Sequence, residues 1–128
     1  RTLPASDAVN DGFALWISAM RWQRLLDRSL ATVGLTHTQY LVLLGADAAV
    51  ADYDDAVTQR AIAERAGLDE ATTSRLVASL CERGLLDRGP TFGDRRAWRV
   101  IVTRTGMRLL ARARPLAEAS ARQFFSER

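Results

Sequence analysis

The sequence contains no lysine, so all eighteen of its Lys/Arg positions are arginines. Together with fifteen acidic residues they give a formal net charge of +3 at pH 7. Arginine stays charged at every physiological pH and carries a planar set of donors that suits phosphate groups and guanine edges. Genomic base composition can produce the same bias, so the arginines favour an anionic partner only weakly.

Cysteine and histidine are almost as scarce, with one of each in the chain, Cys81 and His37. One cysteine excludes an intramolecular disulfide and is consistent with a reducing cytoplasm. One cysteine and one histidine do not supply the four ligands of a usual tetrahedral zinc site. The sequence also has no nucleophile motif and no Walker-type phosphate loop. We therefore expect no enzymatic activity, no metal and no cofactor, with Cys81 as a structural thiol.

Long apolar runs are also missing. No window approaches the length that a membrane span needs, and the first thirteen residues lack the apolar core of a signal peptide. Hydrophobic residues make up 48% of the chain and charged residues 26%, which is ordinary globular usage. The sequence therefore predicts one cytoplasmic domain over residues 1–128, with no membrane partner.

The first third of the chain predicts two helices. Residues 6–30 have helix length and carry apolar side chains on more than one face. A chain of this size can hardly surround such a helix alone, so a second subunit is the natural cover. After Gly34, a second helix is predicted over residues 37–49, because Thr36 and Gln39 have the spacing of a capping box.

The middle of the chain predicts a helix-turn-helix. Thr58 is expected to cap a short helix that stops at Gly67. A longer helix then follows over residues 69–83 and ends before Gly84. Two short helices around such a turn are typical of DNA-binding domains.

The last third predicts a hairpin and a long helix. Two strands are expected near residues 85–88 and 98–102, joined by a link that contains glycine and proline. Thr103 then caps a final helix, which Pro115 should kink or divide. This helix also has more apolar residues than one stripe needs. The fold class is therefore mainly α with a small β-hairpin wing, in which both ends of the chain form a dimer.

The second helix of the helix-turn-helix has a small, polar outward face. Val77 and Leu80 lie on its core stripe. Ser74 and Arg75 project elsewhere, and Thr72 lies at the border. Small residues allow close approach to a major groove, and arginine can bind guanine through two hydrogen bonds. The alternative is that the hydroxyls only favour the helix start and that Arg75 is solvated.

The hairpin tip carries Asp94, Arg95 and Arg96 in succession. A hairpin directly after a recognition helix can place its tip in the neighbouring minor groove, whose negative potential attracts arginine. Asp94 would then hold the turn or orient one arginine. A charged hairpin tip is otherwise usually solvated, and spacing alone does not assign the two arginines.

Three segments in order resemble the MarR family of winged helix-turn-helix transcription regulators. They are LTHTQYLVL at residues 35–43, IAERAGLDEATTSRLVASLCERGLLDR at residues 62–88 and GDRRAWRVIVTRTG at residues 93–106. The resemblance implies an obligate homodimer on a pseudo-palindromic operator in double-stranded DNA. Approximately residues 1–34 and 104–128 would form the dimerisation helices, and residues 35–103 the DNA-binding lobe.

The resemblance also assigns roles to single residues. Thr72, Ser74 and Arg75 fall on the contact positions of the recognition helix. Asp94 and Arg96 fall on the Asp-x-Arg pair of the wing. Arg96 is then the residue expected in the minor groove, and Arg95 is expected to contact a phosphate.

Family members usually repress promoters, and many release DNA when a small aromatic or anionic effector binds. The effector cleft would lie between the dimer region and the DNA-binding lobe. Five residues of the first two helices are candidates for lining this cleft: Trp16, Met20, Trp22, His37 and Tyr40. Tryptophans at helical spacing are equally typical of a core or a dimer interface, so both interpretations remain.

Two other functions are compatible with the sequence. A winged helix can serve as a protein-interaction module, in which the same helix faces a partner protein. It can also act as an architectural DNA binder, with a steep salt dependence and little preference among sequences.

Overall fold

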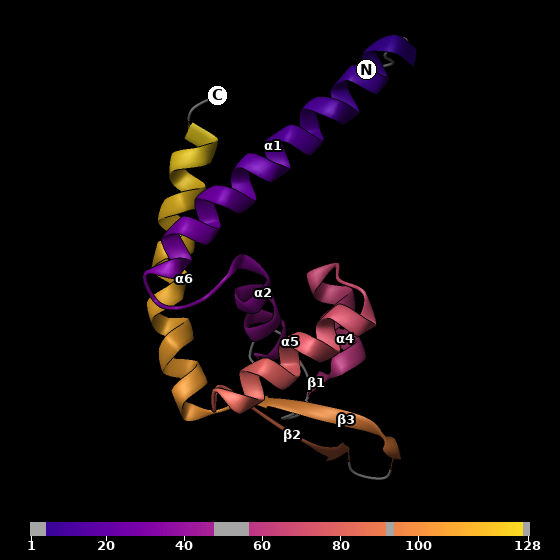
Figure 1. Ribbon diagram of the computed structural model, residues 1–128, viewed down its shortest axis with the longest axis vertical. Coiled ribbons are helices and arrows are strands. Elements are labelled where there is room, and N and C mark those ends of the chain that lie inside the picture. Colours follow the sequence, from indigo (N-terminus) through magenta and orange to yellow (C-terminus); the bar gives the residue numbers. More distant parts are fainter. Residues whose placement is uncertain (1–4, 48–56, 92–93, 127–128) are drawn as a thin grey trace.

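The computed structural model describes residues 5–47, 57–91 and 94–126, which form five helices and a small sheet (Figure 1). The helices are α1 (Ala5–Ala31), α2 (His37–Ala46), α4 (Gln59–Ala66), α5 (Glu70–Glu82) and α6 (Arg104–Ser126). The strands are β1 (Val57–Thr58), β2 (Leu86–Thr91) and β3 (Asp94–Val102). The predicted fold class, mainly α with a hairpin wing, is confirmed.

Short polar side chains begin the helices where the sequence predicts them. Thr36 accepts a hydrogen bond from Gln39 N at 3.2 Å, while the Gln39 side chain accepts one from Thr36 N at 3.0 Å, which completes the capping box. Thr58 caps α4 through Ala61 N at 3.1 Å. The helix predicted over residues 37–49 ends at Ala46, and residues 48–49 lie outside the described part of the chain.

Two glycines in the left-handed region end the helices of the helix-turn-helix. Gly67 follows α4 with a φ of 69°, and Gly84 follows α5 with a φ of 74°. A side chain at such a φ would be strained, which is why glycine is common just after a helix. The chain can therefore reverse within a few residues between α4 and α5, and again between α5 and β2.

The sheet is antiparallel, with the strand order β1-β3-β2. The strands of the hairpin are longer than the expected segments near residues 85–88 and 98–102, since they run to Thr91 and start again at Asp94. The reason is that β2 lies at the edge of the sheet, where Pro90 can be accommodated because its missing N–H need not pair. The link expected between the strands is thus mostly part of the strands themselves.

One apolar core joins the elements of the DNA-binding lobe to the ends of α1 and α6. Its fully buried side chains come from all parts of the chain: Leu30, Val42, Leu43, Val57, Ile62, Val77, Leu80, Leu86, Val100 and Leu110. The N-terminal half of α1 takes no part in this core and projects away from the other elements (Figure 1). Within the described residues, no helix is both long and apolar enough to cross a membrane.

The final helix runs from Arg104 to Ser126 as one element with Pro115 inside it, so Pro115 does not divide it. A proline removes one helical hydrogen bond, and tertiary packing can compensate for that loss. Here α6 packs along α1, and the Ser29 hydroxyl donates to the carbonyl oxygen of Leu116 at 3.5 Å, which holds the two helices together near the proline without replacing the lost bond itself.

The start of α6 is pressed against the junction between α5 and β2. Thr103 N–H donates to Leu85 O at 3.1 Å, the Thr103 hydroxyl donates to Gly84 O at 2.6 Å, and Gly106 N–H donates to Thr103 Oγ1 at 3.0 Å. A Cβ atom at Gly106 would overlap the carbonyl oxygen of Leu85 and lie 2.8 Å from Val102 Cγ1. Only glycine permits this approach.

We predict that Gly106→Ala lowers the free energy of unfolding by about 1–3 kcal/mol, because the backbone of Leu85 must move to admit the methyl group. The matched control is Gly89→Ala in β2, since a Cβ atom at Gly89 meets nothing within 4 Å and alanine is no worse than glycine in a strand. Urea unfolding at one fixed protein concentration measures both variants. Equal stability of the two variants would contradict the contact described here.

Candidate DNA-binding surface

The helix-turn-helix is held in place by its buried faces. On α5, Thr73, Val77 and Leu80 are fully buried, so this face of the helix is fixed against the core. On α4, Ile62 is buried, and the Arg65 Nη1 donates to the carbonyl oxygen of Gly45 on α2 at 2.7 Å. The orientation of α5, and with it the direction of its outward face, is therefore set by packing.

Among the predicted recognition residues, Arg75 projects outward from the first turns of α5, and Thr72 and Ser74 flank it on either side. Arg75 is exposed, while Thr72 and Ser74 are half-buried. The Arg75 Nη2 donates to Thr72 Oγ1 at 3.3 Å. The face thus combines hydroxyl groups with one long cation, which is the chemistry that a major groove requires.

Asp69 forms the N-cap of this helix and belongs to the same group. Its Oδ1 accepts a hydrogen bond from Thr72 N at 2.7 Å, and its Oδ2 accepts one from the Thr72 hydroxyl at 2.8 Å. These hydrogen bonds lower the pKa of the Asp69 carboxyl below its ordinary value, so the group is charged at neutral pH. Sequence reasoning placed Asp69 at the helix start without a role in the surface.

The second strand of the wing, β3, begins with Asp94, Arg95 and Arg96. The side chains of these three residues lie outside the described part of the structure, so their predicted roles remain predictions. Nearer the base of the wing, the Arg88 Nη1 donates to Gln59 Oε1 at 3.3 Å, which links β2 to the first residue of α4.

The residues predicted for an effector cleft lie in different surroundings. Trp16 is 60% exposed and stacks on Phe13, with ring centroids 6.5 Å apart. Trp22 packs against Phe124 and Phe125 of α6, at 5.6 and 5.8 Å. Met20 is half-buried. The two tryptophans therefore have separate partners and do not meet in one cluster.

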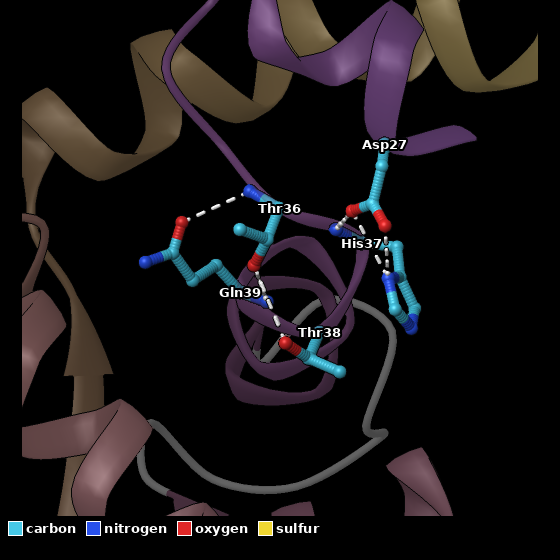
Figure 2. A network of polar contacts seen from close by, with 5 residues as sticks. All are labelled: Asp27, Thr36, His37, Thr38 and Gln39. Carbon is cyan, nitrogen blue, oxygen red and sulfur yellow. Dashed lines mark hydrogen bonds and ion pairs between the residues drawn. The ribbon is translucent and has the colours of Figure 1, made fainter. Parts of the chain in front are cut away.

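The two remaining cleft candidates are on α2. Tyr40 is buried in the core, and burial raises the pKa of its hydroxyl, an effect that the nearby Arg114 guanidinium opposes. His37 contacts α1 instead: Asp27 Oδ1 accepts from His37 N at 2.7 Å, and the His37 Nδ1 lies 3.0 and 3.1 Å from the two Asp27 oxygens (Figure 2). Asp27 therefore ties the end of α1 to the first turn of α2.

A second polar link joins α2 to α6. Asp47, at the C-terminal end of α2, is buried and forms an ion pair with Arg114. Both links were missed from the sequence, because their partners lie ten and sixty-seven positions apart. Together they connect the two terminal helices to the helix that supports the helix-turn-helix.

Cys81 lies half-buried near the end of α5. Burial raises the pKa of its thiol, and the positive charge of Arg88 opposes this only partly. The protonated thiol is therefore the form at neutral pH, which is consistent with the structural role predicted for it. The charge that acts on Cys81 comes from the wing, whereas the sequence suggested Arg83.

The helix-turn-helix followed by a hairpin defines the class: the chain is a winged helix-turn-helix protein. The model of the MarR family matches residues 33–97, just over half of the chain. The chain therefore belongs to the MarR family of transcription regulators.

Individual relatives agree with this assignment. The chain is 29% identical over 118 residues to YdcH, an HTH-type transcriptional regulator of Bacillus subtilis, covering 92% of this chain and 80% of YdcH. It is similar to the structure of CouR of Rhodococcus jostii bound to p-coumaroyl-CoA, with 30% identity and a TM-score of 0.79. The match covers 98% of this chain and 83% of CouR. The fold also matches a mutant form of MarR from E. coli complexed with operator DNA, at 18% identity, 98% and 87% coverage and a TM-score of 0.83.

Proposed function

We propose that this regulator is a homodimer that binds a pseudo-palindromic operator, represses transcription and is released by a small molecule. Residues 35–103 form the DNA-binding lobe, and approximately residues 1–34 and 104–128 form the dimer region. Thr72, Ser74 and Arg75 read bases, Asp94 and Arg96 form the minor-groove contact, and Arg95 binds a phosphate. The operator complex of E. coli MarR, which has the same fold, supports the use of the lobe for DNA.

The observation that carries this proposal is the position of Arg75. It lies exposed at the start of α5, beside Thr72, on a helix whose opposite face is completely buried. A guanidinium group in this position can make two hydrogen bonds to the O6 and N7 atoms of guanine when the helix enters a major groove.

The exposed apolar residues of α1 support the homodimer. Val9, Phe13, Leu15 and Trp16 are 60–72% exposed in a single chain. All four lie on the part of α1 that projects from the protomer (Figure 1). A patch of large apolar side chains is typical of a protein interface, and the symmetric dimer is the commonest assembly.

Release by a small molecule is supported by CouR, whose crystal structure holds p-coumaroyl-CoA. In this chain, the links from Asp27 to His37 and from Asp47 to Arg114 connect the terminal helices to α2. A ligand that prefers one arrangement of these helices would change the distance between the two recognition helices of a dimer, and with it the affinity for DNA.

We expect the wild-type protein to enrich a two-fold symmetric site from a random duplex pool at physiological salt, with half-sites about one helical turn apart. Arg75→Ala should weaken binding to this site by about 1–3 kcal/mol and relax one base preference in each half-site. Arg83→Ala is the matched control, because Arg83 is also exposed but lies at the C-terminal end of α5, about two turns away from Arg75. Equal loss of affinity on every duplex would reject base reading by Arg75.

The alternatives give different results in the same selection. Retention of DNA without enrichment of any sequence would favour an architectural binder. Absence of retention would favour a protein-interaction module.

The wing has its own prediction. Arg96→Ala should weaken binding most on operators whose flanks are rich in A·T pairs, because narrow minor grooves attract arginine most strongly. Titration of one operator core with A·T-rich and G·C-rich flanks measures this difference. An effect that is independent of the flank would count against a minor-groove contact, and Arg95→Ala serves as the comparison for a phosphate contact.

The dimer is tested by sedimentation at micromolar concentration. The wild type should sediment as a dimer, and Phe13→Ser combined with Trp16→Ser should raise its dissociation constant at least about tenfold, because two large aromatic surfaces per subunit lose their cover. Ala14→Ser, on the same exposed segment, is the control. A monomeric wild type would overturn the proposed assembly.

A further inference from the structure

Asp69 makes more contacts with Thr72 than a helix cap needs. One carboxylate oxygen that accepts from one backbone N–H is enough to cap a helix. Here Oδ1 does this at 2.7 Å, while Oδ2 accepts a second hydrogen bond, at 2.8 Å, from the Thr72 hydroxyl. The second contact does not satisfy any backbone group of the helix, so capping does not explain it.

Asp69 itself is held firmly. The buried Thr73 donates its hydroxyl to the Asp69 carbonyl oxygen at 2.8 Å, and its N–H donates to the same oxygen at 3.0 Å. The backbone of Asp69 is thus fixed from the core side of α5. Its carboxylate can therefore orient the side chain on the exposed side.

The second contact decides how Thr72 can bond. A carboxylate only accepts, so the single proton of the Thr72 hydroxyl must point at Asp69. The oxygen of Thr72 then has only lone pairs to offer, and one of them accepts from the Arg75 Nη2 at 3.3 Å. Asp69, Thr72 and Arg75 form a chain of hydrogen bonds with one fixed direction.

We propose that Asp69 is a positioning residue for base recognition: its carboxylate makes Thr72 an acceptor and thereby holds Arg75 along the start of α5. This inference rests on the proposed function of α5 as the recognition helix. Arg75 then loses less side-chain freedom when it meets a base. Because its proton points at Asp69, Thr72 can contact a base only as an acceptor. The donor in the major groove is then the amino group of adenine or cytosine.

The negative charge of Asp69 has a separate effect, which does not depend on the DNA sequence. A carboxylate at the surface that faces DNA repels phosphates and lowers the affinity for every sequence alike. Because this repulsion cancels in the ratio of two affinities, only the contact with Thr72 can make Asp69 favour one sequence over another. A residue that only capped the helix would change the binding of all duplexes in the same direction.

The test is Asp69→Asn, because asparagine caps a helix about as well as aspartate. Its oxygen can keep the bond to Thr72 N, but its amide nitrogen donates and so reverses the hydrogen bond to the Thr72 hydroxyl. We expect the ratio of affinities for the selected site and a scrambled duplex to fall about threefold to tenfold, while affinity for the scrambled duplex stays constant or rises.

A double-mutant cycle with Thr72→Val separates positioning from charge. Valine has nearly the shape of threonine but no hydroxyl to orient, so Asp69→Asn should have little further effect on the affinity ratio in this background. Thr72→Ser keeps the hydroxyl and should keep the wild-type ratio. Thr36→Ala, which removes the cap of α2, controls for a loss of helix stability and should leave the ratio unchanged.

Two results would overturn the inference. One is an equal change of both affinities in Asp69→Asn, which would show a cap and nothing more. The other is the same effect of Asp69→Asn with threonine and with valine at position 72, which would show an effect of charge alone. Absence of any enriched site for the wild type would overturn the proposed function itself, and so is distinguishable from both.

Discussion

The close approach of α6 to the α5–β2 junction is the constraint on which the rest of the structure depends. Gly106 lies against the Leu85 carbonyl, and Thr103 bonds to both Gly84 and Leu85. Three elements of the fold therefore meet within a few residues: the end of α5, the first strand of the wing and the start of α6. Because these bonds are made by backbone atoms and one threonine, the position of the wing relative to α5 does not depend on long, flexible side chains.

Local patterns in the sequence were enough to predict most of the fold. Thr36, Thr58 and Gly67 act over three or four neighbouring positions, so their effect on helix ends can be read directly. Pro115 shows the limit of this reasoning, because its effect on α6 depends on packing against α1, a helix from the other end of the chain. The strand ends of the wing were also misjudged, since the tolerance for Pro90 depends on strand order, which a local pattern does not contain.

The site could be predicted in part for the same reason. The outward projection of Arg75 follows from helix periodicity and is seen in the structure, with the half-buried Thr72 and Ser74 on either side of it. The links from Asp27 to His37 and from Asp47 to Arg114 could not be predicted, because each requires two helices to be placed in space first. By its contacts, α2 lies between the terminal helices and the helix-turn-helix, so both links join these two parts of the chain. In the proposed dimer, they are the described contacts through which a change in the terminal helices would reach α2 and then α5.

The balance of charge on the recognition helix bears on how this protein distinguishes its site. The chain carries eighteen arginines and a formal net charge of +3, and cations attract any duplex regardless of its sequence. Additional cations near α5 would strengthen all binding alike and would leave discrimination unchanged. The Asp69 carboxylate accepts from the Thr72 hydroxyl, which in turn accepts from Arg75, so an acidic residue orders one hydroxyl and one guanidinium on this helix. If Asp69 positions Arg75 as proposed, specificity in a protein with so many arginines depends less on the number of cations than on the acidic residue that orients one of them.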